Sequence, residues 1–80
     1  MSGSKARLRD PLDDAIAARV TSQRRARGIS QQALAQKIGV SFQQVQKYES
    51  GENRIATSRL IRLAHALECK ITDLIPDQDH

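Results

Sequence analysis

The 80-residue sequence predicts a single all-α domain built from short helices. Large apolar residues recur at helical spacing, which is typical of helices with one buried face. No segment alternates between apolar and polar residues for long enough to form a strand. Helix-starting residues and helix-ending glycines follow one another closely along the chain, so each predicted helix is short.

The first predicted helix begins at Asp10 and Pro11, because Asp favours the N-cap and Pro the first helical turn. Asp13 and Asp14 follow in that turn, where carboxylates meet the positive end of the helix dipole. Gly28 predicts the end of the helix. Its buried face is predicted from residues at four-residue spacing, namely Leu12, Ile16 and Val20.

Two further helices are predicted on either side of a very short connection. Ser30 is the predicted N-cap of the second helix, which ends at Gly39. Ser41 is predicted to cap the third helix, with Gln44 completing a capping box, and Gly51 ends it. Because only Gly-Val-Ser separates the two helices, they must meet at a sharp angle.

A fourth helix is predicted after an N-cap at Thr57, and a last turn around residues 72–75 precedes Pro76. The apolar face of the fourth helix is predicted from Leu60, Ile61, Leu63, Ala64 and Leu67. A domain of this size buries only a small core, so a second subunit is expected to add buried area. The apolar residues expected to pair two subunits are Ile71, Leu74 and Ile75.

The folded domain is predicted to span residues 10–76, between a flexible basic arm over residues 1–9 and a short acidic tail over residues 77–80. The sequence contains no apolar run of membrane-spanning length and no signal peptide. Its single cysteine, Cys69, has no partner for an internal disulfide. These features favour a reduced, cytoplasmic setting.

The charge balance of the chain is basic. Thirteen Lys and Arg residues outnumber nine Asp and Glu residues, which gives a formal net charge of +4 and a pI near 9.8. Such an excess favours a polyanionic partner. An anionic membrane surface is the competing interpretation, but no predicted helix is strongly basic on one face and strongly apolar on the other.

The segment from Ser30 to Gly51 reads SQQALAQKIGVSFQQVQKYESG, and an LIRLAHAL helix follows it. Over about residues 16–75 the chain resembles the Cro/CI family of helix-turn-helix proteins, also called the Xre or lambda-repressor-like family. The resemblance implies a five-helix domain in a bacterial or phage-encoded protein. It also implies that the second and third helices read DNA, with the third in the major groove.

The outward surface of the predicted third helix is rich in amides and has no acidic residue before Glu49. A carboxylate there would repel phosphate, whereas a glutamine amide both donates and accepts, which matches the edge of adenine. A lysine reaches guanine acceptors or a phosphate. Phe42 either contacts a thymine methyl or packs on the second helix. The predicted base contacts are Phe42, Gln43, Gln44 and Lys47.

Other residues are expected to contact the DNA backbone. Gln31 follows the cap of the second helix, where backbone N–H groups and the helix dipole favour a phosphate oxygen. The full predicted set is Gln31, Gln32, Asn53 and Arg54, and a basic arm over residues 1–9 is expected to follow the backbone or minor groove. Such contacts position a protein on DNA without reading its sequence.

The resemblance pairs Arg24 with Glu49 as an internal ion pair that joins the first helix to the third. The chain departs from the family pattern at Glu68, where related sequences often have glycine. If Glu68 takes a left-handed conformation, it costs on the order of 1 kcal/mol relative to glycine.

We therefore expect a sequence-specific transcriptional regulator, with repression as the default, that binds a near-palindromic site on double-stranded DNA as a homodimer. The alternative is an antitoxin or another module that binds a partner protein. The sequence has no phosphate loop, dinucleotide turn or nucleophile–base pair, which argues against an enzyme. His65 and Cys69 lie one helical turn apart, but zinc prefers four ligands, so neither a metal nor a cofactor is expected.

Overall fold

The structure is a computed structural model that describes residues 10–77. This range contains the α-helices α1 (Pro11–Ala26), α2 (Gln31–Ile38), α3 (Phe42–Ser50) and α4 (Thr57–Ala66), and the 3-10 helix η1 (Ile71–Asp73). The predicted all-α class is confirmed, with the last of the five expected helices reduced to a single 3-10 turn. The predicted arm over residues 1–9 and residues 78–80 of the predicted tail lie outside the described residues.

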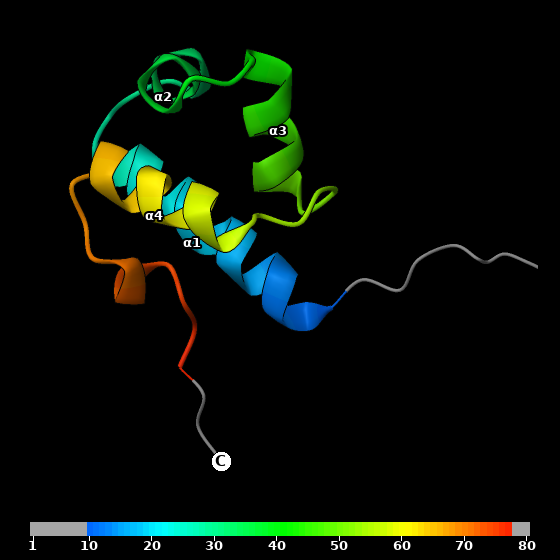
Figure 1. Cartoon of the computed structure of the whole chain (residues 1–80). Coiled ribbons are helices and arrows are strands. Elements are labelled where there is room, and N and C mark those ends of the chain that lie inside the picture. Colours follow the sequence, from blue (N-terminus) through cyan, green and yellow to red (C-terminus); the bar gives the residue numbers. More distant parts are fainter. Residues whose placement is uncertain (1–9, 78–80) are drawn as a thin grey trace, which may run out of the picture.

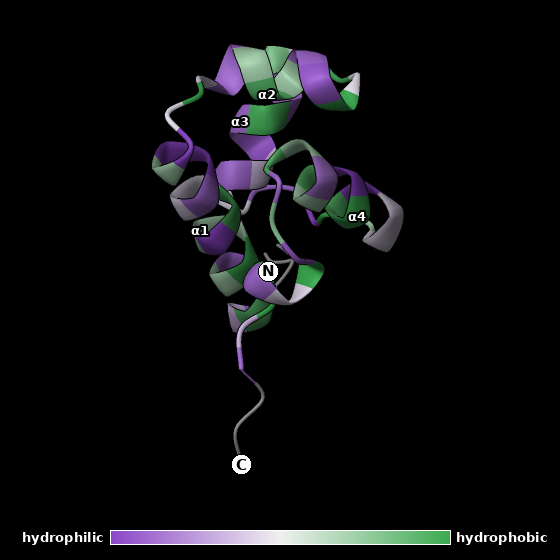
Figure 2. Cartoon of the chain, turned by 90° about the vertical axis from the view of Figure 1, so that its left-hand side faces the viewer, coloured by the Kyte–Doolittle hydropathy of each residue, from purple (hydrophilic) through white to green (hydrophobic). Residues whose placement is uncertain are grey.

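The helices enclose one core. In Figure 1, α2 and α3 lie at one end of the molecule, and η1 lies on the far side of α4 from them. Helix α3 packs against both α1 and α2, while α4 packs against α2 and η1. Figure 2 shows hydrophilic and hydrophobic residues along each α-helix, as expected for helices with one buried face. The largest fully buried side chains are Leu34, Leu63, Leu67, Leu74, Val20 and Val45.

Three of the four predicted N-caps are confirmed. The side chains of Asp10, Ser30 and Ser41 accept hydrogen bonds from backbone N–H groups two or three residues further on, at 2.9, 3.0 and 3.0 Å. The prediction of Thr57 as a cap is wrong. Ala56 occupies the N-cap position, since its carbonyl accepts the first helical bond from the N–H of Leu60 at 2.9 Å.

The predicted buried faces of α1 and α4 are too wide. Leu12 has 45% of its surface exposed and Ile61 has 43%. Leu12 is exposed because it lies in the first turn of α1, at the end of a long helix. With 16 residues, α1 is longer than α3 with 9 and α4 with 10, so these helices cover only part of its apolar face. Ile61 follows the buried Leu60, and one residue rotates a helical position by about 100°, which turns it out of the core.

Leu74 belongs to the core of its own chain. It is fully buried among residues that include Leu60, Leu63 and Leu67. The expectation that Leu74 contributes to a surface between two subunits is therefore wrong, because η1 folds back against α4 and covers it. Ile71 and Ile75 are only partly buried.

The link between α4 and η1 contains the left-handed residue that the family pattern suggested. Glu68 has a φ of 55°, and among the described residues other than glycine it alone has a positive φ. Its carbonyl accepts a hydrogen bond from the guanidinium of Arg27 at 2.6 Å. This bond to the backbone does not depend on the Glu68 side chain.

Replacing Glu68 by glycine is expected to stabilise the domain. Glycine adopts this φ without a Cβ penalty, so Glu68→Gly is expected to raise the free energy of unfolding by about 1 kcal/mol. The lost ion pair with Arg27 is long, at 3.7 Å, and solvent-exposed, so it contributes little. Urea denaturation compares the two proteins, with Glu68→Ala as the control that keeps the Cβ; equal stability of the Gly and Ala variants would contradict the prediction.

Candidate nucleic-acid interface

The turn between α2 and α3 sets the direction of α3. Gly39 ends α2 with a φ of 73°, a left-handed conformation that costs glycine little. Ser41 then caps α3 directly. Because Val45 is buried against the core, the opposite side of α3 faces solvent.

The outward face of α3 carries amides and one cation. Its exposed residues are Gln43, Gln46, Lys47 and Ser50. The predicted base-contact residues Gln43 and Lys47 thus lie on this face, whereas Gln44 and Phe42 are half-buried at its edges. Phe42 lines a shallow hollow together with Gln32 and Gln36 of α2, at the junction of the two helices.

The acidic residue of α3 is turned inward and paired with Arg24. The Nε and Nη2 atoms of Arg24 donate to the Glu49 carboxylate at 2.7 and 3.1 Å. The third nitrogen, Nη1, donates to the Ile29 carbonyl at 3.0 Å. Only 12% of the Arg24 side chain and 6% of the Glu49 side chain are exposed. The pair therefore joins α1, the link before α2 and the end of α3, and it removes the one carboxylate of α3 from the outward face.

Gln31 belongs to the same cluster. Its side-chain amide nitrogen donates to the Glu49 Oε1 atom at 2.9 Å. The amide that was predicted to contact phosphate is thus engaged inside the protein, and sequence reasoning missed this role because Gln31 and Glu49 are far apart in the chain. Gln32, the next residue, is exposed at the start of α2.

The loop after α3 brings the other predicted backbone contacts beside the helix. Asn53 donates its backbone N–H to the Lys47 carbonyl at 3.2 Å, which folds the loop back on the end of α3. Asn53 and Arg54 line a shallow hollow with Gln44 and Tyr48 of α3. The sequence analysis did not single out Tyr48, which is half-buried and lies in this region.

The electrostatics of Glu49 make the ion pair sensitive to acid. Burial raises the pKa of Glu49, but the hydrogen bonds from Arg24 and Gln31 and the charge of Arg24 outweigh burial and hold the pKa below its ordinary value of 4.5. A carboxyl whose pKa is lowered by folding stabilises the protein above its unfolded pKa. That stability is lost as the pH falls through the lower, folded pKa.

We expect the free energy of unfolding to decrease as the pH is lowered below about 4.5, because Glu49 then becomes protonated. The Glu49→Gln variant is expected to lose this part of the pH dependence, although other carboxylates still titrate. Urea denaturation at several pH values between pH 3 and pH 7 measures the free energy of unfolding of both proteins. It locates the pH at which stability begins to be lost to within about one unit. Parallel curves for the two proteins would show that Glu49 contributes nothing to the acid sensitivity.

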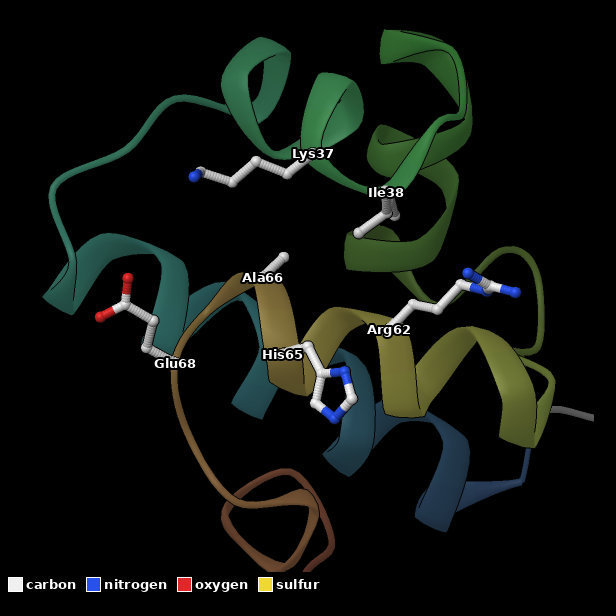
Figure 3. Close-up of a pocket in the computed structure, with 6 residues that line it drawn as sticks. All are labelled: Lys37, Ile38, Arg62, His65, Ala66 and Glu68. Carbon is white, nitrogen blue, oxygen red and sulfur yellow. The ribbon is translucent and has the colours of Figure 1, made fainter.

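A third hollow lies between α2 and α4, lined by Lys37, Ile38, Arg62, His65, Ala66 and Glu68. Figure 3 shows that Lys37 and Arg62 point away from each other, so their charges do not converge on one ligand. No residue of α3 lines this hollow. It is therefore separate from the surface formed by α3 and the following loop.

His65 and Cys69 have no third candidate metal ligand beside them in the described part of the chain. Within residues 10–77, no group of three or more His, Cys, Asp or Glu side chains is placed to hold a metal ion. Burial raises the pKa of the half-buried Cys69 thiol, and the charge of Asp73 adds to this, while Arg27 opposes it. In the same part of the chain, no helix combines the length and the hydropathy needed to cross a bilayer.

The sequence profile of the helix-turn-helix family HTH_3 matches residues 21–74, which contain α2, α3 and α4. The chain belongs to the Cro/CI-like helix-turn-helix family. The resemblance noted in the sequence is thereby confirmed. Family membership makes the chain a DNA-binding regulatory domain rather than an enzyme.

Relatives of this Cro/CI-like chain include regulators from several bacteria. It is 44% identical over 77 residues to an uncharacterized transcriptional regulator in the ATPase CF(0) region of Rhodospirillum rubrum, covering 96% of the chain and 71% of that protein. It is 39% identical over 59 residues to the cryptic phage CTXphi transcriptional repressor RstR of Vibrio cholerae, covering 74% of the chain and 53% of that protein. Other relatives, from Sinorhizobium and Rhizobium, are matched over about half of their length or less.

Solved structures share the fold. The clp gene regulator ClgR from Corynebacterium glutamicum has a TM-score of 0.78 at 26% identity, over 81% of this chain and 84% of that one. The P22 c2 repressor in complex with a synthetic operator has a TM-score of 0.69 at 28% identity, over 75% of this chain and 91% of that one. The restriction-modification controller protein C.AhdI from Aeromonas hydrophila has a TM-score of 0.74 at 27% identity, over 78% and 94% of the two chains.

Proposed function

We propose that this chain is a transcriptional repressor that binds a near-palindromic operator as a homodimer, with α3 in the major groove. The observation that carries the proposal is the outward face of α3. That face presents Gln43, Gln46 and Lys47, while Glu49 is held inside by Arg24. A rigid helical surface with amide and ammonium groups and no free carboxylate suits the donor and acceptor pattern of base edges.

The proposed base contacts are made by Gln43 and Lys47, with Gln44 and Phe42 at the edges of the same face. Phosphate contacts come from the first turn of α2, where Gln32 is exposed, and from Asn53 and Arg54 beside α3. The Gln31 amide donates one of its two N–H groups to Glu49, so its second N–H and the backbone N–H of Gln31 are the donors for a phosphate oxygen. Residues 1–9 add a basic arm that follows the DNA backbone or minor groove.

Repression is supported by two similar proteins, one named as a phage repressor and one solved as a repressor bound to an operator. The dimer is supported by the small core and by apolar residues that remain accessible on one chain, Ile61, Ile71 and Ile75. Two-fold symmetry would place the two α3 helices about 34 Å apart on successive turns of the major groove. A repressor that binds operators works where the bacterial or phage DNA is, so the proposed location is the cytoplasm.

Selection of bound sites from a pool of random DNA duplexes tests whether the outward face of α3 contacts the bases. We expect Gln43→Ala and Lys47→Ala to change the selected consensus, since a good bidentate base contact contributes roughly 1–3 kcal/mol of discrimination. Arg62→Ala is the matched control, because it also removes one exposed cation but lies on α4 in the hollow that no α3 residue lines. It is expected to keep the wild-type consensus.

Identical consensus sites for wild type and both α3 variants would contradict the proposal that the outward face of α3 contacts the bases. Sedimentation of the protein with its selected duplex gives the stoichiometry, and one chain per duplex would contradict the homodimer. Failure to retain DNA at low salt, together with a stable complex with another protein, would favour the antitoxin or protein-interaction alternative.

A further inference from the structure

An ion pair links the loop after α3 to the start of α1. The Nε atom of Arg54 donates to the Oδ2 atom of Asp13 at 3.0 Å. The two residues are 41 positions apart in the chain, so only the fold brings them together. The N-terminal turn of α1 thus places a carboxylate beside a cation of the proposed DNA interface.

The Arg54 guanidinium is exposed beside the edge of α3. Its side chain has 74% of its surface exposed, whereas that of Asp13 has 29%. Arg54 lines a shallow hollow with Gln44, Tyr48 and Asn53, next to the helix proposed to enter the major groove. Since one nitrogen is directed at Asp13, the remaining N–H groups of the guanidinium are free to meet a phosphate oxygen at the same time.

A carboxylate in this position has two opposite effects on DNA binding. It orients the arginine, which would strengthen binding, and it offsets the positive charge of the arginine and repels phosphate, which would weaken binding. The orienting effect is small, because an exposed ion pair immobilises a long arginine side chain only slightly and Arg54 is largely exposed. The carboxylate, in contrast, offsets the charge of Arg54 in every orientation that keeps the pair together, so Arg54 attracts a phosphate less strongly. Neutralisation of Arg54 therefore outweighs its orientation.

We propose that Asp13 lowers the affinity of this interface for DNA by holding a negative charge against Arg54, the cation that the loop after α3 offers to the phosphate backbone. Asp13 is in this sense an affinity-setting residue that contacts no base. The inference rests on the proposed function. Because phosphate contacts carry no sequence information, Asp13 changes the strength of binding and leaves the preferred site unchanged.

The test measures binding to a fluorescent mixed-sequence duplex of roughly 30 base pairs, about three helical turns, over a series of salt concentrations. A mixed sequence suffices, because the contact of Arg54 does not depend on the bases. We expect Asp13→Asn to bind roughly two- to fivefold more tightly than wild type at low salt, the range set by an exposed ion pair. The slope of log affinity against log salt concentration is expected to become steeper by up to about 0.9, the contribution of one phosphate.

Two controls isolate the Arg54 contact. Glu68→Gln removes an equivalent charge from another exposed carboxylate–arginine pair, on the link after α4, and is expected to change affinity less than Asp13→Asn. In an Arg54→Ala background, the gain from Asp13→Asn is expected to shrink to that of the Glu68→Gln control. Circular dichroism and thermal unfolding confirm that each variant is folded.

An affinity of Asp13→Asn equal to or weaker than that of a wild-type protein that binds DNA would overturn this inference and leave the proposed function standing. A gain that persists undiminished in the Arg54→Ala background would also overturn it, because the effect would then not pass through Arg54. Absence of binding by every folded variant at low salt would overturn the proposed function itself.

Discussion

Replacing Arg24 by methionine is expected to lower the free energy of unfolding by about 3–5 kcal/mol. The change leaves the Glu49 carboxylate, with 6% of its side chain exposed, without its cationic partner. It also frees the Ile29 carbonyl, which accepts a hydrogen bond from Arg24. A domain of this size has a total stability of roughly 4–12 kcal/mol, so the loss is a large share of it. Urea denaturation followed by circular dichroism at pH 7 measures the change.

Arg25→Met is the matched control, because Arg25 is the next residue on α1 and is exposed. It is expected to change stability by less than about 0.5 kcal/mol. In the Glu49→Gln background, Arg24→Met is expected to cost much less, since no buried charge is then left unpaired. A loss of under about 1 kcal/mol for Arg24→Met in the wild-type background would show that the pair does not hold α1 to α3.

Leu74→Ala is expected to lower the free energy of unfolding by about 2–5 kcal/mol. Leu74 is fully buried although it lies only six residues from the end of the chain. Its removal leaves a cavity between η1 and α4, which the surrounding helices fill only in part. Thermal and urea unfolding of the two proteins measure the difference.

Ile61→Ala is the control for Leu74→Ala, because it also truncates a large aliphatic side chain but one with 43% of its surface exposed. We expect it to have a clearly smaller effect on the stability of one chain. Equal effects of the two substitutions at concentrations where the protein is monomeric would show that η1 is not part of the core.

The helix boundaries were predictable where a short polar side chain or a glycine acts on the backbone a few residues away. Asp10, Ser30 and Ser41 form hydrogen bonds within three residues, so their roles depend on local sequence alone. The prediction for Thr57 failed because Thr is also tolerated inside a helix. Ala56, the actual N-cap of α4, has no polar side chain that would indicate its role.

Burial was predictable from periodicity only where a neighbouring helix covers the predicted face. Leu12 and Ile61 fit the apolar spacing of their helices, yet both are exposed. Leu74 was assigned to an outer surface, yet it is fully buried. Periodicity shows which side of a helix is apolar, but the lengths and packing of the other helices decide how much of that side is covered.

The candidate interface also has features that the local sequence predicts and features that depend on the tertiary structure. The amide-rich outward face of α3 follows from the helical repeat and the burial of Val45. The engagement of Gln31 with Glu49 and the pairing of Arg54 with Asp13 join residues 18 and 41 positions apart. No local pattern signals such contacts, and Asp13 looked like a helix-dipole residue only.

The amino-acid sequence by itself determined the helices, their order and the family of this protein, because caps, glycines and apolar spacing act within a few residues. The family resemblance predicted the Arg24–Glu49 ion pair, and only the tertiary structure decided that Gln31 joins it and that Asp13 lies against Arg54. The physical reason is distance along the chain. Contacts between remote residues form only when the packed core brings their helices together, and charge then acts at short range between groups that the sequence keeps far apart.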